Sequence, residues 1–467
     1  MGGMTRRSFL ASTAAGAAAL SEAAHAAPGS NRPNILFILT DEQRKDTLGC
    51  YGNDLAITPA FDGLAARGVR FNSCYTTQPV CAPCRSSLIT GLYPTSTGVV
   101  ENLIPLRPDL FAWPRALHEQ GYRTAYIGKW HLGTDPVPDY FDVWKGYNTG
   151  WPHWIREEPV YMLPGETAAE YEARIEAGDR STAAGEEHIG RYRADLETDH
   201  AIDFIRNAGE EPFLCFVGFY PPHTPMHAPE EDIELHRGKF ASEYDDIYHA
   251  MVHRLDKNFA RMLATLDEQG LRENTLIVVA SEHGHVYPRR WNDHIKRLCY
   301  DQASNVPLLM SWPGVLPEGR VVPEVINSAD LVPTLLELAG APWPEDMHGE
   351  SAVRLIHGDA SDWHEDVLIQ NAPYRTHGGA PEGVDVDMRE RCVVTNDWKL
   401  ILNTSRDPEL YRRHEDPKEE HNLFGQADTL EVTRDLAQRL IAWGERISDD
   451  MPADLVQKWE SRWMAGA

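Results

Sequence analysis

Residues 34–42 read NILFILTDE, a run of mostly apolar side chains that passes directly into two carboxylates, Asp41 and Glu42. Continuous apolar runs of this length are typical of parallel strands that are buried on both faces. Amphipathic stretches such as HAIDFIRNAG (200–209) separate such runs along the chain. The alternation predicts an α/β fold, a large doubly wound sheet, mixed or mostly parallel, that is flanked by helices. Three further runs end in the same way, in charged or imidazole side chains: RTAYIG (123–128), PFLCFVGF (212–219) and TLIVVAS (275–281).

The polar residues that follow these runs are expected to meet at one edge of the sheet. In a doubly wound sheet the ligand site lies outside the carboxyl ends of the strands. Some of these side chains offer the oxygen and imidazole ligands that suit a hard divalent cation, and others supply positive charge or protons. An oxygen-rich metal site beside a cluster of cations predicts a site for a tetrahedral oxyanion ester. The candidate ligands are Asp41, Glu42, Glu282 and His283, and the other group is Lys129, His131, His223 and Lys296.

Residues 78–91 read QPVCAPCRSSLITG and contain two cysteines, Cys81 and Cys84. The pair is compatible with a redox site, with half of a zinc site, or with a function for one cysteine alone. Pro83 suits the first turn of a helix and Gly91 suits its C-terminal stop, so Cys81 would lie at a helix N-terminus, where the helix dipole favours an anion. The chain has no second CxxC motif, which argues against structural zinc, and the stretch does not lie in a small βαβ domain near the chain start, as a thioredoxin-like site should.

The first 26 residues are predicted to be a twin-arginine signal peptide. Arg6 and Arg7 precede an apolar run at residues 9–20, and Ala24-His25-Ala26 has the small residues of a cleavage site. This pattern predicts a periplasmic or secreted protein. The apolar run is too short for the alternative, a membrane anchor, and no other stretch is long and apolar enough for a transmembrane segment.

The amino-acid composition argues against some classes of function. The chain of 467 residues carries a formal net charge of −27, which argues against nucleic-acid binding and, less strongly, against an anionic membrane surface. A small anionic substrate remains possible, because a few buried cations create a local positive pocket in an acidic protein. The seven cysteines are an odd number without a regular framework, so at least one is expected to be unpaired or modified.

These residues together resemble the type I, formylglycine-dependent sulfatases of the alkaline phosphatase superfamily. CAPCRSSLITG matches the signature in which a cysteine, followed by proline at the second position and arginine at the fourth, is oxidised to formylglycine. Counted from Cys81, these positions hold Pro83 and Arg85, whereas Cys84 is followed there by Ser86 and Leu88. The resemblance therefore implies conversion of Cys81 by a formylglycine-generating maturase. Other matching segments are RPNILFILTDEQ, GYRTAYIGKWHLG, PPHTP, SEHG and KRLCYDQASNVPLLMSWPG.

The resemblance also implies roles for individual residues. Arg85 and Lys129 would hold the hydrated aldehyde, and His131 would be the base that acts on it. His223 and Lys296 would grip the sulfate or protonate the leaving alcohol. The expected metal is Ca²⁺, with Mg²⁺ as the alternative. Its implied ligands are Asp41, Glu42, converted Cys81, Glu282 and His283, of which the two glutamates stand where the family usually has aspartate.

Two stretches bear on the substrate. Arg289, Arg290 and His294 closely follow SEHG and are candidates for gripping a second anionic group. Three tryptophans lie in a segment rich in glycine and proline, which indicates either a sugar-stacking platform or the packing of a long loop onto the domain. They are Trp144, Trp151 and Trp154.

Residues 32–350 are expected to form the catalytic domain, and residues 355–467 a smaller α+β domain in which an antiparallel sheet packs on a helix. The expected activity is the hydrolysis of sulfate monoesters. A sulfated carbohydrate is the preferred substrate over a small aryl sulfate. The expected partners are therefore a sulfated small molecule or glycan and the formylglycine-generating maturase. One alternative is a phosphonate or phosphodiester hydrolase of the same superfamily. The other is a catalytically silent sulfated-glycan-binding protein.

Overall fold

The computed structural model describes residues 32–150, 152–286, 296–371 and 388–464. The predicted signal peptide, Trp151, Arg289, Arg290 and His294 lie outside these ranges. Within them the largest element is a nine-stranded sheet with the order β4-β3-β5-β1-β6-β8-β2-β7, in which β9 also pairs with β2. Its strands are β1 (Asn34–Thr40), β2 (Val69–Tyr75), β3 (Arg123–Lys129), β4 (Val143–Tyr147), β5 (Phe213–Gly218), β6 (Thr275–Ser281), β7 (Asn305–Val306), β8 (Leu308–Ser311) and β9 (Arg320–Asn327).

The four apolar runs of the sequence form adjacent strands at the centre of this sheet. The strands β4, β3, β5, β1 and β6 are all parallel, and β1 pairs with β5 on one side and with β6 on the other. β8 then runs antiparallel both to β6 and to β2. The predicted α/β fold with a large mixed, mostly parallel sheet is confirmed.

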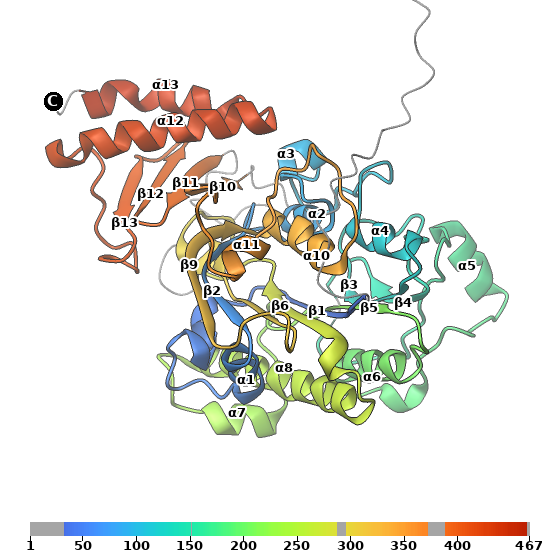
Figure 1. Ribbon diagram of the computed structural model, residues 1–467. Helices are drawn as coiled ribbons and strands as arrows, with labels where there is room; N and C mark the ends of the chain where they lie inside the picture. Colours follow the sequence, from blue (N-terminus) through green and yellow to red (C-terminus); the bar gives the residue numbers. More distant parts are fainter. Residues whose placement is uncertain (1–31, 151, 287–295, 372–387, 465–467) are drawn as a thin grey trace, which may run out of the picture.

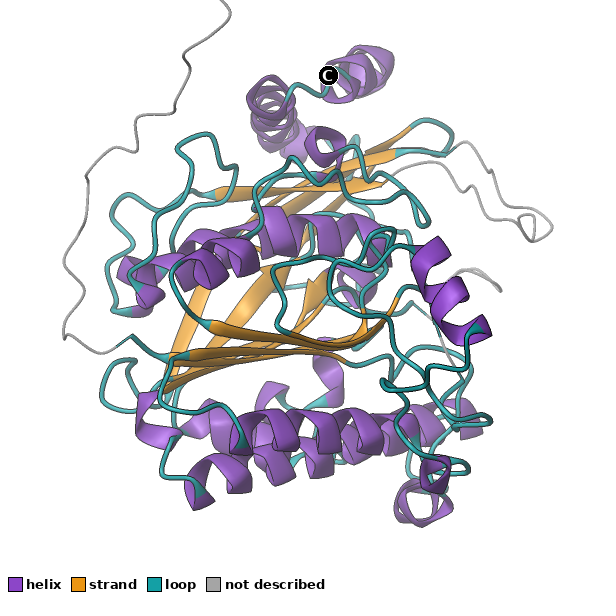
Figure 2. Ribbon diagram, turned by 90° about the vertical axis from the view of Figure 1, so that its right-hand side faces the viewer, coloured by secondary structure: helices purple, strands orange, loops and turns teal. Residues whose placement is uncertain are grey.

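Helices cover both faces of this sheet (Figures 1 and 2). Along β1, Phe37 packs in the core under α2, α4 and α10, whereas its neighbours Leu36 and Ile38 pack in the core under α1, α6 and α8. Both faces are therefore apolar, which explains why β1 reads as a continuous apolar run. The helices of this part are α1 (Pro59–Ala66), α2 (Cys81–Thr90), α3 (Pro94–Thr97), α4 (Trp113–Glu119), α5 (Ala168–Glu176), α6 (Arg193–Arg206), α7 (Glu230–His236), α8 (Glu243–Glu268), α9 (Asp301–Ser304), α10 (Leu331–Ala339) and α11 (Val353–Ile356).

A second, antiparallel sheet lies toward the C-terminus with the order β10-β11-β12-β13. One face packs against α12, where Leu400 and Leu440 share a core, and the other packs against the first part of the chain, where Val367 shares a core with Tyr75. The predicted C-terminal antiparallel sheet with helices is confirmed, while the domain boundaries at 350 and 355 stay predictions. Its elements are β10 (Asp366–Asn371), β11 (Glu390–Thr395), β12 (Trp398–Asn403), β13 (Glu409–Arg412), α12 (Leu430–Ile447) and α13 (Met451–Met464).

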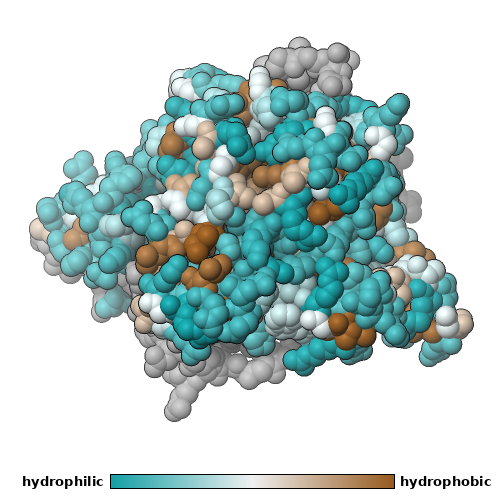
Figure 3. Space-filling model, turned by 90° about the horizontal axis from the view of Figure 1, so that it is seen from below, coloured by the Kyte–Doolittle hydropathy of each residue, from teal (hydrophilic) through white to brown (hydrophobic). Residues whose placement is uncertain are grey.

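One face of the molecule shows how polar and apolar residues are distributed on the surface. On the face viewed in Figure 3, hydrophilic residues predominate and hydrophobic residues form separate small groups. Among the described residues, no helix combines the length and the apolar character needed to cross a membrane.

Candidate active site

Helix α2 carries Cys81 at its first position and is buried along its whole length. As predicted from the sequence, Pro83 lies in the first turn and the helix ends at Gly91, whose φ is 75° and whose N–H donates to the Ser87 carbonyl over 2.8 Å. A glycine is required there, because a Cβ at Gly91 would lie 2.4 Å from the Met347 sulfur in a backbone conformation that other residues rarely adopt. The helix thus presents the Cys81 thiol from its N-terminal end.

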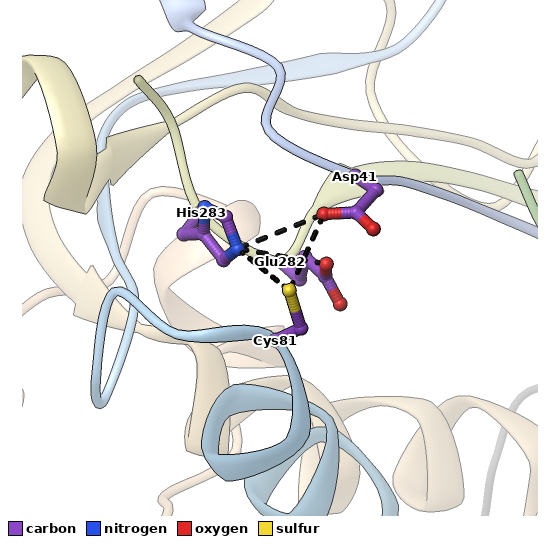
Figure 4. A group of neighbouring side chains, drawn as sticks. All are labelled: Asp41, Cys81, Glu282 and His283. Atoms are coloured by element: carbon purple, nitrogen blue, oxygen red, sulfur yellow. Dashed lines mark hydrogen bonds and ion pairs between the residues drawn. The ribbon is translucent and has the colours of Figure 1, made fainter. Parts of the chain in front are cut away.

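Two paired strands bring the acidic groups to this thiol (Figure 4). Thr40 at the end of β1 is in register with Ser281 at the end of β6, so the residues that follow, Asp41 and Glu282, lie side by side. The Glu282 N–H donates to the Thr40 carbonyl over 3.1 Å, which fixes the two ends together. The carboxyl ends of these two strands therefore bring Asp41 and Glu282 together at the edge of the sheet where the sequence predicts a site.

Asp41, Cys81, Glu282 and His283 form one buried cluster, in which one ligand atom from each lies within 4.8 Å of the others. The Cys81 sulfur lies 3.3 Å from Nε2 of His283 and 3.7 Å from Oδ1 of Asp41. Nε2 of His283 is 3.6 Å from Oδ1 of Asp41 and 3.6 Å from Oε1 of Glu282. Four potential ligand atoms thus converge on one point.

The electrostatics of Glu282 fit a divalent cation at that point. Its Oε1 is buried and has no hydrogen-bond partner. Burial raises the pKa of Glu282 well above its usual range, with Asp41 adding to this and Arg85 opposing it. A cation between the two carboxylates would remove this penalty, and two carboxylates with one imidazole suit a metal that prefers oxygen ligands. The residues present therefore fit a divalent metal ion.

Two positively charged side chains form ion pairs with the carboxylates of this cluster. Lys129 forms a buried ion pair with Asp41, and Arg85 forms one with Glu282. The Arg85 guanidinium also donates to the Tyr126 hydroxyl over 3.1 Å and to the Lys129 carbonyl. Arg85 thus joins the helix that carries Cys81 to the end of β3 that carries Lys129.

Lys296, His223 and Glu42 line the more accessible side of the thiol. Nζ of Lys296 lies 3.2 Å from the Cys81 sulfur and 2.9 Å from Nε2 of His223. The side chains of Lys296 and His223 are 15% and 17% exposed, whereas Asp41 and Glu282 are fully buried. Lys296 and His223 are therefore the more accessible groups beside Cys81.

Glu42 turns away from the four-residue cluster, although it directly follows Asp41. Its φ is 62°, and its Oε1 lies 2.6 Å from Nζ of Lys296 and 3.3 Å from Nε2 of His223. Burial by itself would raise the pKa of Glu42, but His223 and Lys296 outweigh burial and hold the pKa at about 2. In this structure Glu42 is the counter-ion of Lys296 and a neighbour of His223, and its assignment as a metal ligand stays a prediction.

The charges also set the protonation of His131 and Cys81. Burial, and then the Lys129 ammonium, lower the pKa of His131 to about 4, so this ring is neutral at pH 7 and is able to accept a proton. Burial alone would raise the pKa of the Cys81 thiol, but Lys129, Lys296 and His283 outweigh burial and hold it well below its usual range. The site therefore stabilises an anion at position 81.

Cys84, the second cysteine of the motif, lies outside the four-residue cluster that contains Cys81. The Cys84 sulfur faces the Ser328 hydroxyl at 4.0 Å, and burial raises the pKa of this thiol to about 12. All seven cysteines fall within the described ranges and are free there. The hypothesis of a redox pair finds no support in this arrangement.

The tryptophans divide between core and surface. Trp144 is only 3% exposed and stacks on Tyr126, with ring centroids 5.2 Å apart, so it packs the core and does not form a sugar platform. Trp154 is 36% exposed. Tyr126 and Tyr220 also contact the site but were not predicted as site residues. Tyr126 accepts a hydrogen bond from Arg85, and Nζ of Lys129 lies 5.2 Å from the ring centroid of Tyr220. Tyr220 could have been found from its place directly before the Pro-Pro-His motif.

Comparison with known proteins identifies the family. The sulfatase family model matches residues 33–341, and the model of the N-sulphoglucosamine sulphohydrolase C-terminal region matches residues 289–446. The chain is 29% identical to the uncharacterized sulfatase YidJ of Escherichia coli over 90% of this chain and 88% of the relative. It is 26% identical to an N-acetylglucosamine-6-O-sulfatase of Bacteroides thetaiotaomicron, over 93% of this chain and 91% of the relative.

Solved structures agree at the level of the fold. A Bacteroides thetaiotaomicron structure from work on the metabolism of multiple glycosaminoglycans has a TM-score of 0.76 at 21% identity, covering 91% of this chain and 99% of the other. A structure solved with its substrate D-glucosamine-2-N,6-O-disulfate scores 0.73 at 22% identity, covering 90% and 99%. The phosphonate monoester hydrolase of Agrobacterium radiobacter scores 0.68 at 22% identity, covering 88% and 95%. With a family model that spans most of its length, this chain belongs to the type I sulfatases of the alkaline phosphatase superfamily.

Proposed function

We propose that this protein hydrolyses sulfate monoesters of a sulfated carbohydrate and that Cys81, converted to formylglycine, is its nucleophile. The observation that carries the proposal is the setting of Cys81, whose sulfur lies between the Lys296 ammonium and the Asp41–His283 pair at 3.2–3.7 Å. This is the charge distribution that an attacking oxygen and a sulfate ester need, with a cation-binding side and a substrate side.

The two groups that the chain must acquire each supply one kind of chemistry. The hydrated aldehyde offers two hydroxyl groups on one carbon, one to attack sulfur and one to release sulfate by collapse to the aldehyde. A divalent cation, Ca²⁺ by preference and Mg²⁺ as the alternative, would be held by Asp41, Glu282, His283 and residue 81 and would polarise the bound oxygens.

The chain's own residues supply the rest of the reaction. Lys129 and Arg85 hold the acidic ligands in place, and the positive charges of Lys129 and Lys296 stabilise an anion at position 81. Neutral His131 accepts the proton whose loss releases sulfate. His223 and Lys296, the accessible pair, face the leaving alcohol, and one of them donates its proton.

A carbohydrate substrate is supported by the relatives. One curated relative is an N-acetylglucosamine-6-O-sulfatase, and one structure of the same fold was solved with a disulfated glucosamine. The predicted twin-arginine signal at residues 1–26 fits this substrate class, because export to the periplasm gives access to scavenged glycans. The rival is phosphonate or phosphodiester hydrolysis, since the fold is shared with a phosphonate monoester hydrolase.

The test is a substrate panel with protein co-produced with a formylglycine-generating maturase. We expect sulfate release from defined sulfated mono- and oligosaccharides and much slower turnover of phosphate and phosphonate esters. Peptide mass spectrometry should find the aldehyde or its hydrate at position 81 and a thiol at 84. Cys84→Ser should retain activity within about twofold because Cys84 faces Ser328, whereas Cys81→Ala should abolish activity. Preferred turnover of the phosphonate esters, or no turnover by fully converted protein, would refute the proposal.

A further inference from the structure

A buried ion pair lies beside the Lys296 side of the site. The Arg297 guanidinium donates to both carboxylate oxygens of Glu101, over 2.6 and 2.7 Å. Glu101 is 7% exposed and Arg297 is 5% exposed. Such a two-point contact fixes the orientation of both side chains as well as their separation.

The backbone of Arg297 is tied to the turn that precedes Cys81. Its N–H donates to the carbonyl of Pro79 over 3.0 Å, and its φ of 79° is a conformation that arginine rarely adopts. A non-glycine residue persists in this conformation only where surrounding contacts hold it. Lys296, the preceding residue, therefore owes its place to the contacts of Arg297.

Glu101 belongs to a short segment that also holds the start of α2. The next residue, Asn102, accepts a hydrogen bond from the Ala82 N–H over 3.0 Å and donates its own N–H to Glu101 over 2.7 Å. The Gln78 amide donates to the Val100 carbonyl over 2.9 Å. Segment 100–102 is thus bonded to the residues on both sides of Cys81 and to the residue next to Lys296.

We infer that Glu101 and Arg297 are a positioning pair that holds the Lys296 ammonium against residue 81 and His223. The inference rests on the proposed function, in which Lys296 grips sulfate or protonates the alcohol. The pair acts through Lys296: it keeps Nζ of Lys296 at 3.2 Å from the Cys81 sulfur. Small displacements of such a group slow a reaction strongly, because the transition state needs it in one place.

The test replaces the whole pair, because removing one partner leaves a buried charge and endangers folding. Apolar residues of similar volume often replace a buried ion pair without loss of stability, so the variant is Glu101→Leu with Arg297→Met. The matched control is Glu166→Leu with Arg174→Met, since Arg174 also contacts both oxygens of Glu166, at 2.7 and 3.1 Å, and the two side chains are 7% and 11% exposed.

Three quantities are measured on each protein: aldehyde content at residue 81, calcium affinity by calorimetry, and kcat/KM on a sulfated sugar. The double variant should lose about tenfold or more in kcat/KM with aldehyde content and calcium affinity unchanged, and the control should stay within about twofold. Unchanged kcat/KM in the double variant would refute the positioning role. An equal loss in the control, or a parallel loss of calcium affinity, would also refute it, because general damage would then explain the result.

Crystal structures of the unaltered protein and the double variant separate this inference from the proposed function. If the unaltered, converted enzyme releases no sulfate, the proposed function is wrong, and the distance from Nζ of Lys296 to residue 81 still decides the role of the pair. A displaced Lys296 in the double variant supports the inference, and an unmoved Lys296 refutes it.

Discussion

Asp41 and Glu42 are neighbours in the chain, yet their carboxylates face different partners. Asp41 joins Cys81, Glu282 and His283, while the left-handed backbone of Glu42 directs its side chain to Lys296 and His223. The sequence alone predicted both as metal ligands. It contains no signal for this difference, because the direction of Glu42 depends on one backbone angle in the turn after β1.

This difference leads to a test of metal binding. Glu282→Gln should weaken calcium binding by about 100-fold, because it removes a charged ligand from a buried site, whereas Glu42→Gln should weaken it by less than about tenfold. Calorimetric titration of metal-free protein with Ca²⁺ measures both. Asp41→Asn serves as a second ligand control. Equal losses for Glu42→Gln and Glu282→Gln would show that Glu42 binds the metal after all.

A carboxyl group outside the four-residue cluster, that of Glu197, makes stability depend on pH. Burial raises the pKa of Glu197 to about 7, although Arg193 and the Tyr147 hydroxyl, which donates to it over 2.8 Å, oppose the shift. A raised carboxyl pKa means that the neutral form is favoured by folding. The contribution of neutral Glu197 to the free energy of unfolding is complete below the unfolded pKa of 4.5 and is lost as the pH rises through 7.

Glu197→Gln should remove this loss, since glutamine keeps an acceptor for Tyr147 and carries no charge. Relative to the unaltered protein, the variant should gain roughly 2–3 kcal/mol of unfolding free energy between pH 5 and pH 8. Thermal unfolding at a series of pH values measures this. The exposed Glu172→Gln is the control. A constant difference between variant and parent at every pH would contradict the assignment.

At the scale of elements, the sequence predicted the four central parallel strands and did not predict the other strands of the large sheet. The runs that form β1, β3, β5 and β6 were readable because both faces of these strands are buried. β7 has two residues and β9 contains Pro323 and Glu324, so neither shows a clear pattern. The antiparallel pairing of β8 with β6 depends on contacts between distant residues, such as Leu309 with Val279, which no local pattern encodes.

Helix α2 offers a test at this scale, because its end at Gly91 fixes the end of the element that carries Cys81. Gly91→Ala forces alanine into φ near 75° and places its Cβ against the Met347 sulfur. We expect a loss of about 1–3 kcal/mol in unfolding free energy. Denaturant unfolding gives the value. The matched control is Gly98→Ala, which has a φ of 80° with nothing within 4 Å of the added Cβ, and it should cost less.

At the scale of the whole molecule, the C-terminal sheet is fastened to the first part of the chain by buried charges. Lys399 on β12 is fully buried and pairs with Asp301 of α9 and with Glu419, each at 2.7 Å. The Tyr300 hydroxyl donates to Glu409 of β13 over 2.8 Å. The segment from Lys296 to Asp301 is thus anchored in the second sheet. The resemblance covers this segment through the match of KRLCYDQASNVPLLMSWPG, but the partners of Tyr300 and Asp301 came only from the structure.

Lys399→Met should destabilise the protein by about 3–5 kcal/mol, because it leaves the buried Glu419 and the partly buried Asp301 without their shared cation. The control is Arg206→Met, whose ion pair with Glu268 is solvent-exposed and should contribute less than about 1 kcal/mol. Calorimetry compares the two variants. If both lose the same amount, the buried triad does not hold the two sheets together.

The burial of Cys81 has a consequence for how active enzyme is made. The residue is 1% exposed and every residue of α2 is buried, so another enzyme reaches it only before this helix packs against the sheet. For the conversion of Cys81 proposed above, maturation and folding therefore compete for the same newly made chain. A molecule that folds first keeps its thiol. The active fraction of a preparation is then set by the ratio of two rates during synthesis, and adding maturase to the finished protein leaves it unchanged.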